Sequence, residues 1–287
     1  MIIFMNSEFI KDTEATISPF DHGFLYGLGA FETFRMYNGF PFLLNDHLKR
    51  LQAALFQLGI SYKINREEIF HMLQKLVDLN HLQGEDVTVR LNISAGNGEV
   101  GKLAQTYQTP NILCFLRGAP SVAEPIEKDA RILQTPRNTP EGPYRIKSHH
   151  YLNNIIGKRE IQNTPEAEGF FLTEKGFLAE GVVSNIFWVK DNRVYTPALE
   201  TGILNGITRQ FVIKCLRVMG VAVEEGLYNP EDLLGASEVF ITNSSQEIVS
   251  IKKVDDRLFQ GNDGIIVKKL TELYRQNRKK LLSIEEL

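Results

Sequence analysis

An eight-residue segment at positions 118–125 divides the chain and limits how it can fold. It contains two prolines, a glycine and a serine, and the hydrophobic periodicity of helices and strands stops there. We therefore predict an interdomain linker at 118–125, between a small N-terminal α+β domain (1–117) and a larger C-terminal domain (126–287). Neither part shows the regular strand–helix alternation of a doubly wound sheet, so the α+β class is expected.

Before the linker, apolar spacing predicts strands and two helices. Asn38-Gly39 between two apolar runs is a strong hairpin signal, because both residues tolerate positive φ. One helix is expected to be capped by Asn45, and another by Asn65 in a capping box with Glu68. The strands are expected at the N-terminus and at 31–37, 40–44, 86–94 and 112–116.

After the linker, the same reading predicts a second set of elements. The expected strands are 130–134, 169–173, 182–189, 221–224 and 238–242. The expected helices are 151–161, 208–219 and 265–280. This C-terminal set again mixes helices and strands without a regular order.

Charge and cysteine content exclude several functional classes. With 32 Lys+Arg and 35 Asp+Glu, the net charge is 32 − 35 = −3, and no block of like charge suggests a nucleic-acid or membrane partner. The two cysteines, Cys114 and Cys215, lie in apolar runs and are predicted to be buried thiols rather than a disulfide or zinc site. The N-terminus lacks the basic region of a signal peptide, and no apolar run approaches the ~18 residues of a membrane span. A soluble, cytoplasmic globular protein with a small polar partner is expected.

A glycine-rich turn leads into Thr208, which is expected to be the N-cap of a helix, and this helix start is a candidate phosphate site. The free N–H groups and the positive dipole end of a helix N-terminus attract anions, and Thr208 would add a hydroxyl donor. The alternative is an ordinary capped amphipathic helix. Thr242, Ser244 and Ser245 follow a predicted strand and could donate to the same anion, or could simply form a turn.

Three charged residues are candidates for chemistry. Lys147 lies in a polar loop, where it is either solvated or a Schiff-base lysine whose pKa is lowered by partial burial. Glu180 stands at the entry to an apolar strand and needs a partner, for which a neighbouring backbone N–H would suffice. Arg50 either binds an anion or forms a surface ion pair with Asp46 at i−4.

Metal and hydrolase chemistry are not supported by the sequence. The histidines of Asp21-His-Gly and His149-His150 lack the spacing of two His and a carboxylate on one element. No Gly-x-Ser-x-Gly elbow is present either. We therefore expect no metal site.

Several of these residues together resemble a known family. Their order and spacing are similar to those of the pyridoxal-phosphate enzymes of fold type IV, which include D-amino-acid aminotransferases, branched-chain aminotransferases and aminodeoxychorismate lyases. The matching residues are Arg50, Lys147, Glu180, Ile207, Thr208 and Ser244. The resemblance covers essentially the whole chain and implies a two-domain fold with the cofactor, pyridoxal 5′-phosphate, between the domains. It also implies a homodimer.

The resemblance implies a role for each residue. Lys147 would form the Schiff base with the cofactor, Glu180 would pair with the pyridine nitrogen, and Leu204 would pack on the ring. The residues implied to hold the phosphate are Arg50, Ile207, Thr208 and Ser244. The further implied cofactor contacts are Tyr151 and Asn185, and the implied substrate contacts are Tyr26, Phe31 and Arg90.

Within the family, the N-terminal part looks most like the bacterial aminodeoxychorismate lyases. D-amino-acid aminotransferases resemble one another in a Tyr at the Phe31 position and an Arg-x-His trap, which the residues after Asn92 do not offer. Branched-chain enzymes carry a Tyr-x-Arg pattern, of which only Arg90 is present, and a glycine where Thr33 stands. A threonine at this position is similar to the lyases, where it is implicated in catalysis.

The expected reaction is therefore the conversion of 4-amino-4-deoxychorismate to 4-aminobenzoate and pyruvate, a step toward folate. Lys147 would remove the proton from the carbon that bears the nitrogen, and Thr33 would help to protonate the departing oxygen. Arg90 would pair with a substrate carboxylate or form a structural ion pair. The alternatives are an aminotransferase for D- or branched-chain amino acids, and a non-enzymatic pyridoxal-phosphate carrier.

Overall fold

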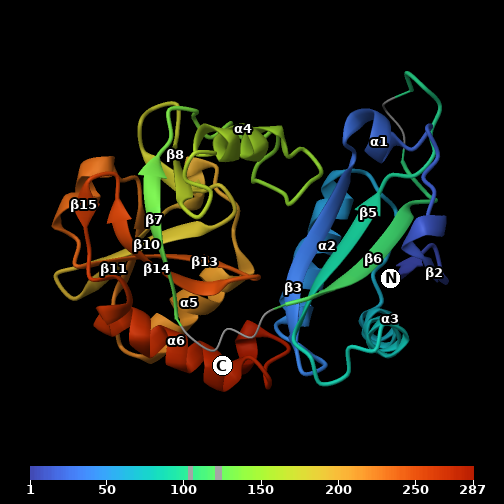
Figure 1. The fold of residues 1–287 in the computed structure, drawn as a ribbon. Coiled ribbons are helices and arrows are strands. Elements are labelled where there is room, and N and C mark those ends of the chain that lie inside the picture. Colours follow the sequence, from blue (N-terminus) through green and yellow to red (C-terminus); the bar gives the residue numbers. More distant parts are fainter. Residues whose placement is uncertain (103–105, 120–124) are drawn as a thin grey trace. The chain divides into compact units, whose positions relative to one another are not determined.

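The computed structural model describes residues 1–102, 106–119 and 125–287 and forms two compact units (Figure 1). Unit 1 contains Met1–Ser121, Ile146–His150 and Arg278–Glu286. Unit 2 contains Val122–Arg145, Tyr151–Asn277 and Leu287. The linker predicted at 118–125 falls in part on residues 120–124, which lie outside the described residues, so the predicted domain boundaries stay a prediction.

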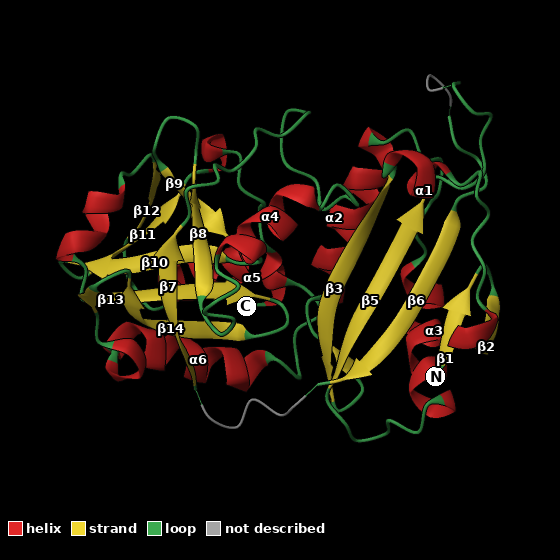
Figure 2. Ribbon diagram, turned by 45° about the horizontal axis from the view of Figure 1, so that its top comes forward, coloured by secondary structure: helices red, strands yellow, loops and turns green. Residues whose placement is uncertain are grey.

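Unit 1 is built on one sheet of six strands in the order β2-β1-β6-β5-β3-β4, with β3, β5 and β6 as its long central strands (Figure 2). The strands are β1 (Ile2–Met5), β2 (Glu8–Lys11), β3 (Gly29–Tyr37), β4 (Phe40–Pro41), β5 (Val87–Ser94) and β6 (Asn111–Gly118). The helices are α1 (His22–Tyr26), α2 (Leu44–Gln57) and α3 (Arg66–Leu79). Apolar residues of α2 and α3 pack with one face of this antiparallel sheet in a single core.

The hairpin predicted at Asn38-Gly39 is confirmed and aligns the strand that carries several site residues. Asn38 and Gly39 both have positive φ, 51° and 79°, and β3 pairs antiparallel with β4 on either side of them. Along β3, Ala30 and Phe34 belong to the core beneath the helices. Because side chains alternate along a strand, Glu32 shares that core face, while Phe31 and Thr33 lie on the opposite face.

The two predicted helix caps in unit 1 have different outcomes. Asn65 caps α3 as predicted, since its side chain accepts hydrogen bonds from the N–H groups of Glu67 and Glu68. Asn45 does not cap α2 but lies inside it: the helix begins at Leu44, and its N-cap is Leu43, which has a left-handed backbone with φ 54°. The backbone N–H of Asn45 instead donates to the carbonyl of Leu282, a partner far along the chain that local sequence rules cannot identify.

Unit 2 contains a nine-stranded mixed sheet. Its order is β12-β11-β10-β13-β14-β7-β8-β9, with β15 paired to β14, and the β11–β12, β7–β14 and β7–β8 pairs are parallel. The strands are β7 (Ile126–Ile132), β8 (Glu168–Leu172), β9 (Leu178–Gly181), β10 (Asn185–Lys190), β11 (Arg193–Pro197), β12 (Val223–Gly226), β13 (Glu238–Asn243), β14 (Glu247–Val254) and β15 (Arg257–Leu258). Both sheets with their helices confirm the α+β class.

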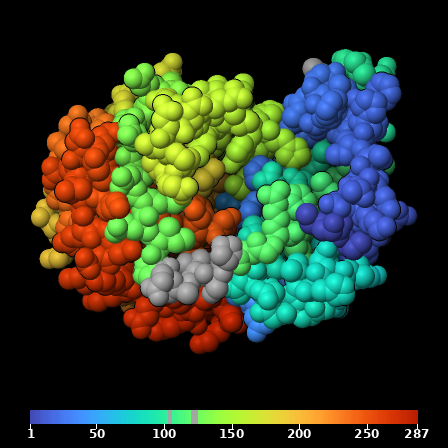
Figure 3. All heavy atoms as spheres, viewed as in Figure 1, coloured from blue at the N-terminus to red at the C-terminus, as the bar shows by residue number. Residues whose placement is uncertain are grey.

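Three α-helices complete the description of unit 2: α4 (Leu152–Glu160), α5 (Ile207–Val218) and α6 (Ile265–Asn277). Its short 3-10 helices lie at Leu199–Thr201, Pro230–Gly235 and Gly261–Asp263, and those of unit 1 lie at Asp12–Glu14 and Ile284–Glu286. The rings of Phe211 on α5 and Tyr274 on α6 meet edge to face at 5.5 Å. The other side of α6 is exposed and forms a red band on the surface of the unit (Figure 3).

The strand predicted at 182–189 is confirmed only from residue 185, and its later start matters for the site. The chain forms β9 up to Gly181, turns at 182–184, and starts β10 at Asn185. The backbone N–H of Gly181 donates to the carbonyl of Ser184, which closes this turn. The apolar residues on both sides of Ser184 and Asn185 hid the turn from the sequence analysis. The turn places Glu180 and Asn185 on different strands with their side chains within hydrogen-bond distance.

Two further predictions from composition can be compared with the structure. Cys114 and Cys215 are both buried free thiols, as predicted, and burial raises the pKa of the Cys215 thiol to about 12. Among the described residues, none of the helices combines the length and the apolar character that crossing a membrane requires.

Candidate active site

Glu180 on β9 is a buried carboxylate at the centre of a polar network in unit 2. Its Oε1 accepts a hydrogen bond from Nε of Arg137 at 2.8 Å, and Nε of Arg145 lies 3.7 Å from the same oxygen. Its Oε2 accepts from the backbone N–H of Leu204 at 3.0 Å and from Nδ2 of Asn185 at 3.4 Å. The backbone N–H that contacts this carboxylate is that of Leu204, 24 positions away, rather than a neighbouring one, which the sequence also allowed. Two guanidinium groups and the Leu204 loop hold this carboxylate.

Arg137 and Arg145 are functional candidates that the sequence analysis missed. Both lie in the irregular Pro/Gly-containing stretch before Lys147, and nothing in that stretch signals that their side chains are buried. Burial and the nearby positive charge of Arg137 lower the pKa of Arg145 to about 10, which still leaves its guanidinium charged at neutral pH. Nη1 of Arg137 also donates to Oδ1 of Asn153 on α4 at 2.6 Å.

The N-terminus of α5 brings two predicted phosphate ligands together. The helix begins at Ile207, with Gly206 as its N-cap, so the expectation that Thr208 caps the helix is wrong. Thr208 is instead the second helical residue, and its Oγ1 lies 3.3 Å from Oγ of Ser244, just after β13. A Cβ at Gly206 would lie 2.1 Å from Oδ1 of Asn185, so only glycine permits this approach of the backbone. The structure thus places Thr208, Ser244 and Asn185 around one helix N-terminus.

The remaining hydroxyl candidates, Ser245 and Thr242, differ in their surroundings. Oδ1 of Asn243 accepts hydrogen bonds from the N–H groups of Ser245 and Gln246, so ordinary turn chemistry accounts for Ser245. Thr242 is almost fully buried, and its Oγ1 has no hydrogen-bond partner among the described residues. Thr242 lies opposite Asn185 in the β10–β13 register. A buried hydroxyl without a partner is what a site for a polar ligand provides.

A second cluster lies in unit 1, on the face of β3 away from the helices. The guanidinium of Arg90 on β5 stacks 3.3 Å from the ring centroid of Phe31, and Nζ of Lys147 lies 4.7 Å from the same centroid. Nε of Arg90 donates to Oδ1 of Asn92 at 3.0 Å, and its Nη1 lies 3.5 Å from Oγ1 of Thr33. Four of the predicted residues, Lys147, Phe31, Thr33 and Arg90, are therefore gathered at one place in this unit. Within this cluster the Arg90 guanidinium is both stacked and hydrogen-bonded.

The segment Ile146–His150 is held against β3, which explains how Lys147 reaches this cluster. The backbone N–H of Phe31 donates to the carbonyl of Lys147, and the N–H of His149 donates to the carbonyl of Gly29. The ring of His149 stacks on Phe31 at 6.2 Å. Burial, together with the charge of Arg90, lowers the pKa of His149 to about 4. A neutral imidazole thus borders the cluster at neutral pH, a residue that the sequence analysis did not select.

The other predicted residues have separate surroundings. Tyr26 lies on α1, where its ring contacts His22 at 4.8 Å and its hydroxyl accepts from the N–H of Gly101. Tyr151 is the N-cap residue of α4 and is partly exposed. Arg50 on α2 pairs with the buried Glu32, whereas the alternative partner Asp46 accepts hydrogen bonds from the N–H of Ile284 and the hydroxyl of Ser283. Their roles toward ligands stay predictions.

These donors fit the cofactor that the resemblance implies. A phosphate ester needs several N–H and O–H donors, and unit 2 offers the free N–H groups of α5 with the Thr208 and Ser244 hydroxyls and the unpartnered Thr242 hydroxyl. A ring nitrogen that carries a proton needs a buried carboxylate, which Glu180 supplies. In unit 1, Lys147 supplies the primary amine that an aldehyde requires.

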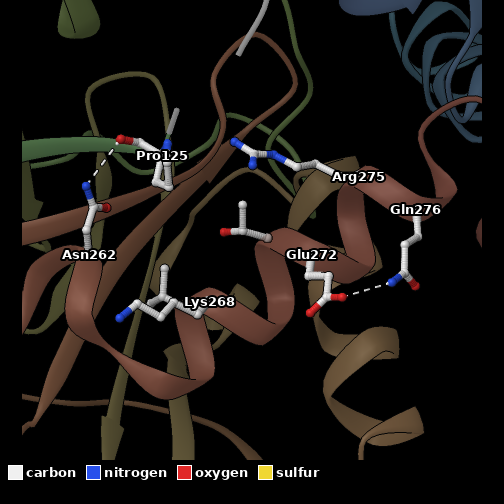
Figure 4. A pocket seen from close by; sticks show the side chains of 8 residues that line it. Pro125, Asn262, Lys268, Glu272, Arg275 and Gln276 are labelled. Atoms are coloured by element: carbon white, nitrogen blue, oxygen red, sulfur yellow. Dashed lines mark hydrogen bonds between the residues drawn. The ribbon is translucent and has the colours of Figure 1, made fainter. Parts of the chain in front are cut away.

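A shallow surface pocket of about 410 Å³ lies along α6, separate from these clusters. Its lining residues on α6 include Lys268, Glu272 and Arg275 (Figure 4). The Glu272 carboxylate turns away from Pro125 and Asn262 and accepts a hydrogen bond from Gln276. The side chain of Asn262 donates to the Pro125 carbonyl at 3.2 Å. None of the predicted site residues lines this pocket, so we assign no chemistry to it.

We expect Arg137→Met to destabilise the protein at neutral pH, because it removes the closest positive charge from the buried Glu180 carboxylate. Breaking a buried ion pair costs about 3 kcal/mol or more, and the nearby Arg145 should keep this loss at the low end. Urea denaturation would measure it. In the double variant Arg137→Met/Glu180→Gln, part of the lost stability should return. If the two single effects simply add, the pair is not coupled.

We also expect His149 to titrate with a midpoint near pH 4 in an NMR experiment, with His149→Gln used to assign its signal. An imidazole whose pKa is lower in the folded than in the unfolded state, ~6.5, makes the unfolded state bind more protons. The wild type should therefore lose stability, relative to His149→Gln, as the pH falls from about 6.5 to about 4. A midpoint at the ordinary value of imidazole would contradict the buried position.

Comparison with known proteins relates this geometry to a family. The amino-transferase class IV family matches residues 29–254. The chain is 46% identical to an aminodeoxychorismate lyase of Bacillus subtilis over 98% of this chain and 96% of that protein. Its fold is similar to the branched-chain amino acid aminotransferase of Escherichia coli, with a TM-score of 0.87, 25% identity, and coverage of 97% of this chain and 94% of that one.

A second similar structure was solved in its PLP form. The branched-chain amino acid aminotransferase of Thermobaculum terrenum in its PLP form has a TM-score of 0.85 and 27% identity, covering 96% of this chain and 92% of that one. The fold is therefore that of the fold-type IV pyridoxal-phosphate enzymes, as the resemblance implied. The chain belongs to the amino-transferase class IV family, whose enzymes use pyridoxal 5′-phosphate.

Proposed function

We propose that this protein is an aminodeoxychorismate lyase, which converts 4-amino-4-deoxychorismate to 4-aminobenzoate and pyruvate with pyridoxal 5′-phosphate as its cofactor. The observation that carries the proposal is the cluster on β3, where a lysine amine, a threonine hydroxyl and a guanidinium surround Phe31. A β-elimination from an anionic substrate needs a base, a proton donor for the leaving oxygen and a cation for a carboxylate. The 46% identity to the lyase of Bacillus subtilis supports the same reaction.

The residues proposed to hold the cofactor are those that the family resemblance implies. We assign the phosphate to Arg50, the N-terminus of α5 at Ile207, and the hydroxyls of Thr208 and Ser244. We assign Lys147 to the aldehyde carbon and Glu180 to the pyridine nitrogen, with Leu204, Asn185 and Tyr151 as further contacts. When bound, the cofactor supplies an aldehyde that condenses with an amine and a pyridinium ring that accepts electron density from the adjacent carbon.

The chain's own residues then divide the remaining work. The Lys147 amine, once free, takes the proton from the substrate carbon that bears the nitrogen. The bond between the ring and the enolpyruvyl oxygen breaks, and the Thr33 hydroxyl donates a proton toward that departing oxygen. Nη1 of Arg90, at 3.5 Å from Oγ1 of Thr33, favours the negative charge that develops there and is placed to bind a substrate carboxylate. The ring becomes aromatic as 4-aminobenzoate, and the released enol becomes pyruvate.

The neutral His149 and the stacked Phe31 suit an aromatic product. Phe31 is buried and presents its ring to both Arg90 and Lys147. We propose that Phe31 and Tyr26 contact the substrate ring, and that Arg90 contacts its carboxylate. A guanidinium that is already stacked and hydrogen-bonded loses little freedom when an anion binds, which favours affinity.

An aminotransferase is the second candidate, because the fold is also that of branched-chain aminotransferases. Both reactions need the same first proton transfer at Lys147. Only the lyase reaction needs a donor for a leaving oxygen, and Thr33 offers a hydroxyl at that cluster. A pyridoxal-phosphate carrier would need none of these groups. We further propose that the protein works in the cytoplasm as a homodimer, as the family resemblance implies.

Incubation of the purified protein with 4-amino-4-deoxychorismate should release pyruvate and 4-aminobenzoate in equal amounts. Alanine or leucine with 2-oxoglutarate, as the control reaction, should give little or no product. Lys147→Ala should abolish both lyase activity and the cofactor absorbance band that borohydride reduces. Turnover in the aminotransferase control alone would overturn the proposed function, and an unchanged band in Lys147→Ala would remove that lysine from its role.

Thr33→Gly should lower the rate of pyruvate release by about 10²-fold or more, since general acid catalysis contributes about 10²–10⁴-fold. Cofactor binding should remain, because the hydroxyl is not among the proposed cofactor contacts. Thr33→Ser, which keeps a hydroxyl, should retain most of the activity and serves as the matched control. Full activity of Thr33→Gly would exclude Thr33 from the reaction.

A further inference from the structure

Glu32 and His47 form a buried polar cluster with Arg50 in unit 1 that the proposed reaction does not use. Glu32 is fully buried on the core face of β3, and the His47 side chain is 2% exposed on α2. His47 and Arg50 are three residues apart on the helix, so their side chains lie on the same side of it. The three side chains meet beneath α2, where that helix packs on β3.

The geometry of the cluster is specific. Nε of Arg50 donates to Oε1 of Glu32, and Nη2 of Arg50 donates to Oε2, both at 2.7 Å. This side-on, two-point pairing fixes both the position and the plane of the guanidinium. Nδ1 of His47 lies 2.7 Å from the same Oε2 and completes the cluster. The His47 ring also packs on Phe34 at 5.1 Å, so the imidazole itself cannot rotate freely.

The protonation states of Glu32 and His47 keep the pairing with Arg50 in place at neutral pH. Burial alone would raise the pKa of Glu32, but Arg50 and His47 bring it down to about 2. Burial lowers the pKa of His47, so its ring is neutral and donates its Nδ1 hydrogen to the carboxylate. A buried carboxylate of this kind is costly unless it is fully paired. An Arg50 side chain that made only a surface contact would not need a buried carboxylate as its partner.

The pairing with Glu32 also fixes which edge of the Arg50 guanidinium faces the carboxylate. Nε and Nη2 face Glu32, and the planar guanidinium therefore directs its Nη1 side away from the carboxylate. The Arg50 side chain is 17% exposed, so the paired group is not sealed inside the core. A long arginine side chain loses entropy when it binds an anion, and a guanidinium that is already fixed has lost that entropy in advance.

We propose that Glu32, with His47, is a positioning residue that holds the Arg50 guanidinium in the orientation needed for the phosphate of pyridoxal 5′-phosphate. The inference rests on the proposed function, in which Arg50 is a phosphate ligand. Glu32 does not contact the cofactor and acts only through Arg50. The two faces of β3 thus have different proposed roles. Phe31 and Thr33 face the substrate, and Glu32 between them acts on phosphate binding through Arg50.

The test compares the affinity of the full-length apoprotein for pyridoxal 5′-phosphate with its affinity for pyridoxal, which lacks the phosphate. Absorbance titration gives both dissociation constants. Glu32→Gln should weaken binding of the phosphate ester by about tenfold or more, because one charge-assisted contact is misaligned. Its affinity for pyridoxal should stay within about twofold. Adding Glu32→Gln to Arg50→Met should cause no further loss, since the two residues act as a unit.

Two further variants distinguish the effect of the position of the Glu32 carboxylate from the effects of its charge and of changes in folding. Glu32→Asp keeps the negative charge but withdraws the carboxylate from the guanidinium, and it should weaken phosphate-ester binding in the same direction. Asp46→Asn is the matched control on the same helix, next to His47, and should bind like the wild type because Asp46 pairs with Ile284 and Ser283. If Glu32→Gln does not fold, Glu32→Asp carries the test.

Each outcome has a distinct meaning. Unchanged or tighter binding of the phosphate ester by both Glu32 variants would overturn the positioning role. An equal loss for pyridoxal and its phosphate would also overturn it, because the loss would then be a general structural effect. Wild-type protein that binds the cofactor but does not release pyruvate would refute the proposed lyase reaction and leave the Glu32 test valid.

Discussion

Each unit contains a buried carboxylate that remains in place because guanidinium groups compensate its charge. Glu32 is paired with Arg50, and Glu180 is paired with Arg137 and flanked by Arg145. An uncompensated carboxylate in such surroundings would cost several kcal/mol, so each carboxylate has to keep its guanidinium partner. The proposed site depends on them, because they fix the side chains that would meet the phosphate and the ring nitrogen.

The alternation of β3 organises the chemistry of unit 1. Ala30, Glu32 and Phe34 point to the core under α2, and Phe31 and Thr33 point to the other face. Pairing with β5 brings Arg90 opposite Thr33, and the short segment around Lys147 is hydrogen-bonded along the strand. A shift of one residue in this register would exchange the two faces. The hairpin at Asn38-Gly39 therefore contributes to the site although it lies at the far end of the strand.

In unit 2 the site residues lie in or at the ends of strands and helices, and turns bring them together. The turn at 182–184 separates Glu180 from Asn185, and the loop before α5 brings the Leu204 N–H to the carboxylate. Gly206 allows the backbone to pass within contact distance of Asn185. Because loops of this kind are fixed by contacts between distant residues, their conformation cannot be deduced from local propensity. This explains why the sequence analysis identified the residues but misjudged the strand boundaries and the helix cap.

Local patterns in the sequence were sufficient for the α+β class, most helices, the hairpin, the buried cysteines and the family, because periodicity and motif spacing are properties of adjacent residues. They also identified Lys147 and Glu180 as chemical candidates, whereas Thr33 was implied by the family resemblance. The tertiary structure alone revealed that Arg137 and Arg145 hold Glu180 and that Arg50 pairs with Glu32 rather than Asp46. Arg137 and Glu180 are 43 positions apart, and Arg50 and Glu32 are 18 apart. Which charges become buried together depends on how the strands pair and where the helices pack, and no local rule contains that information.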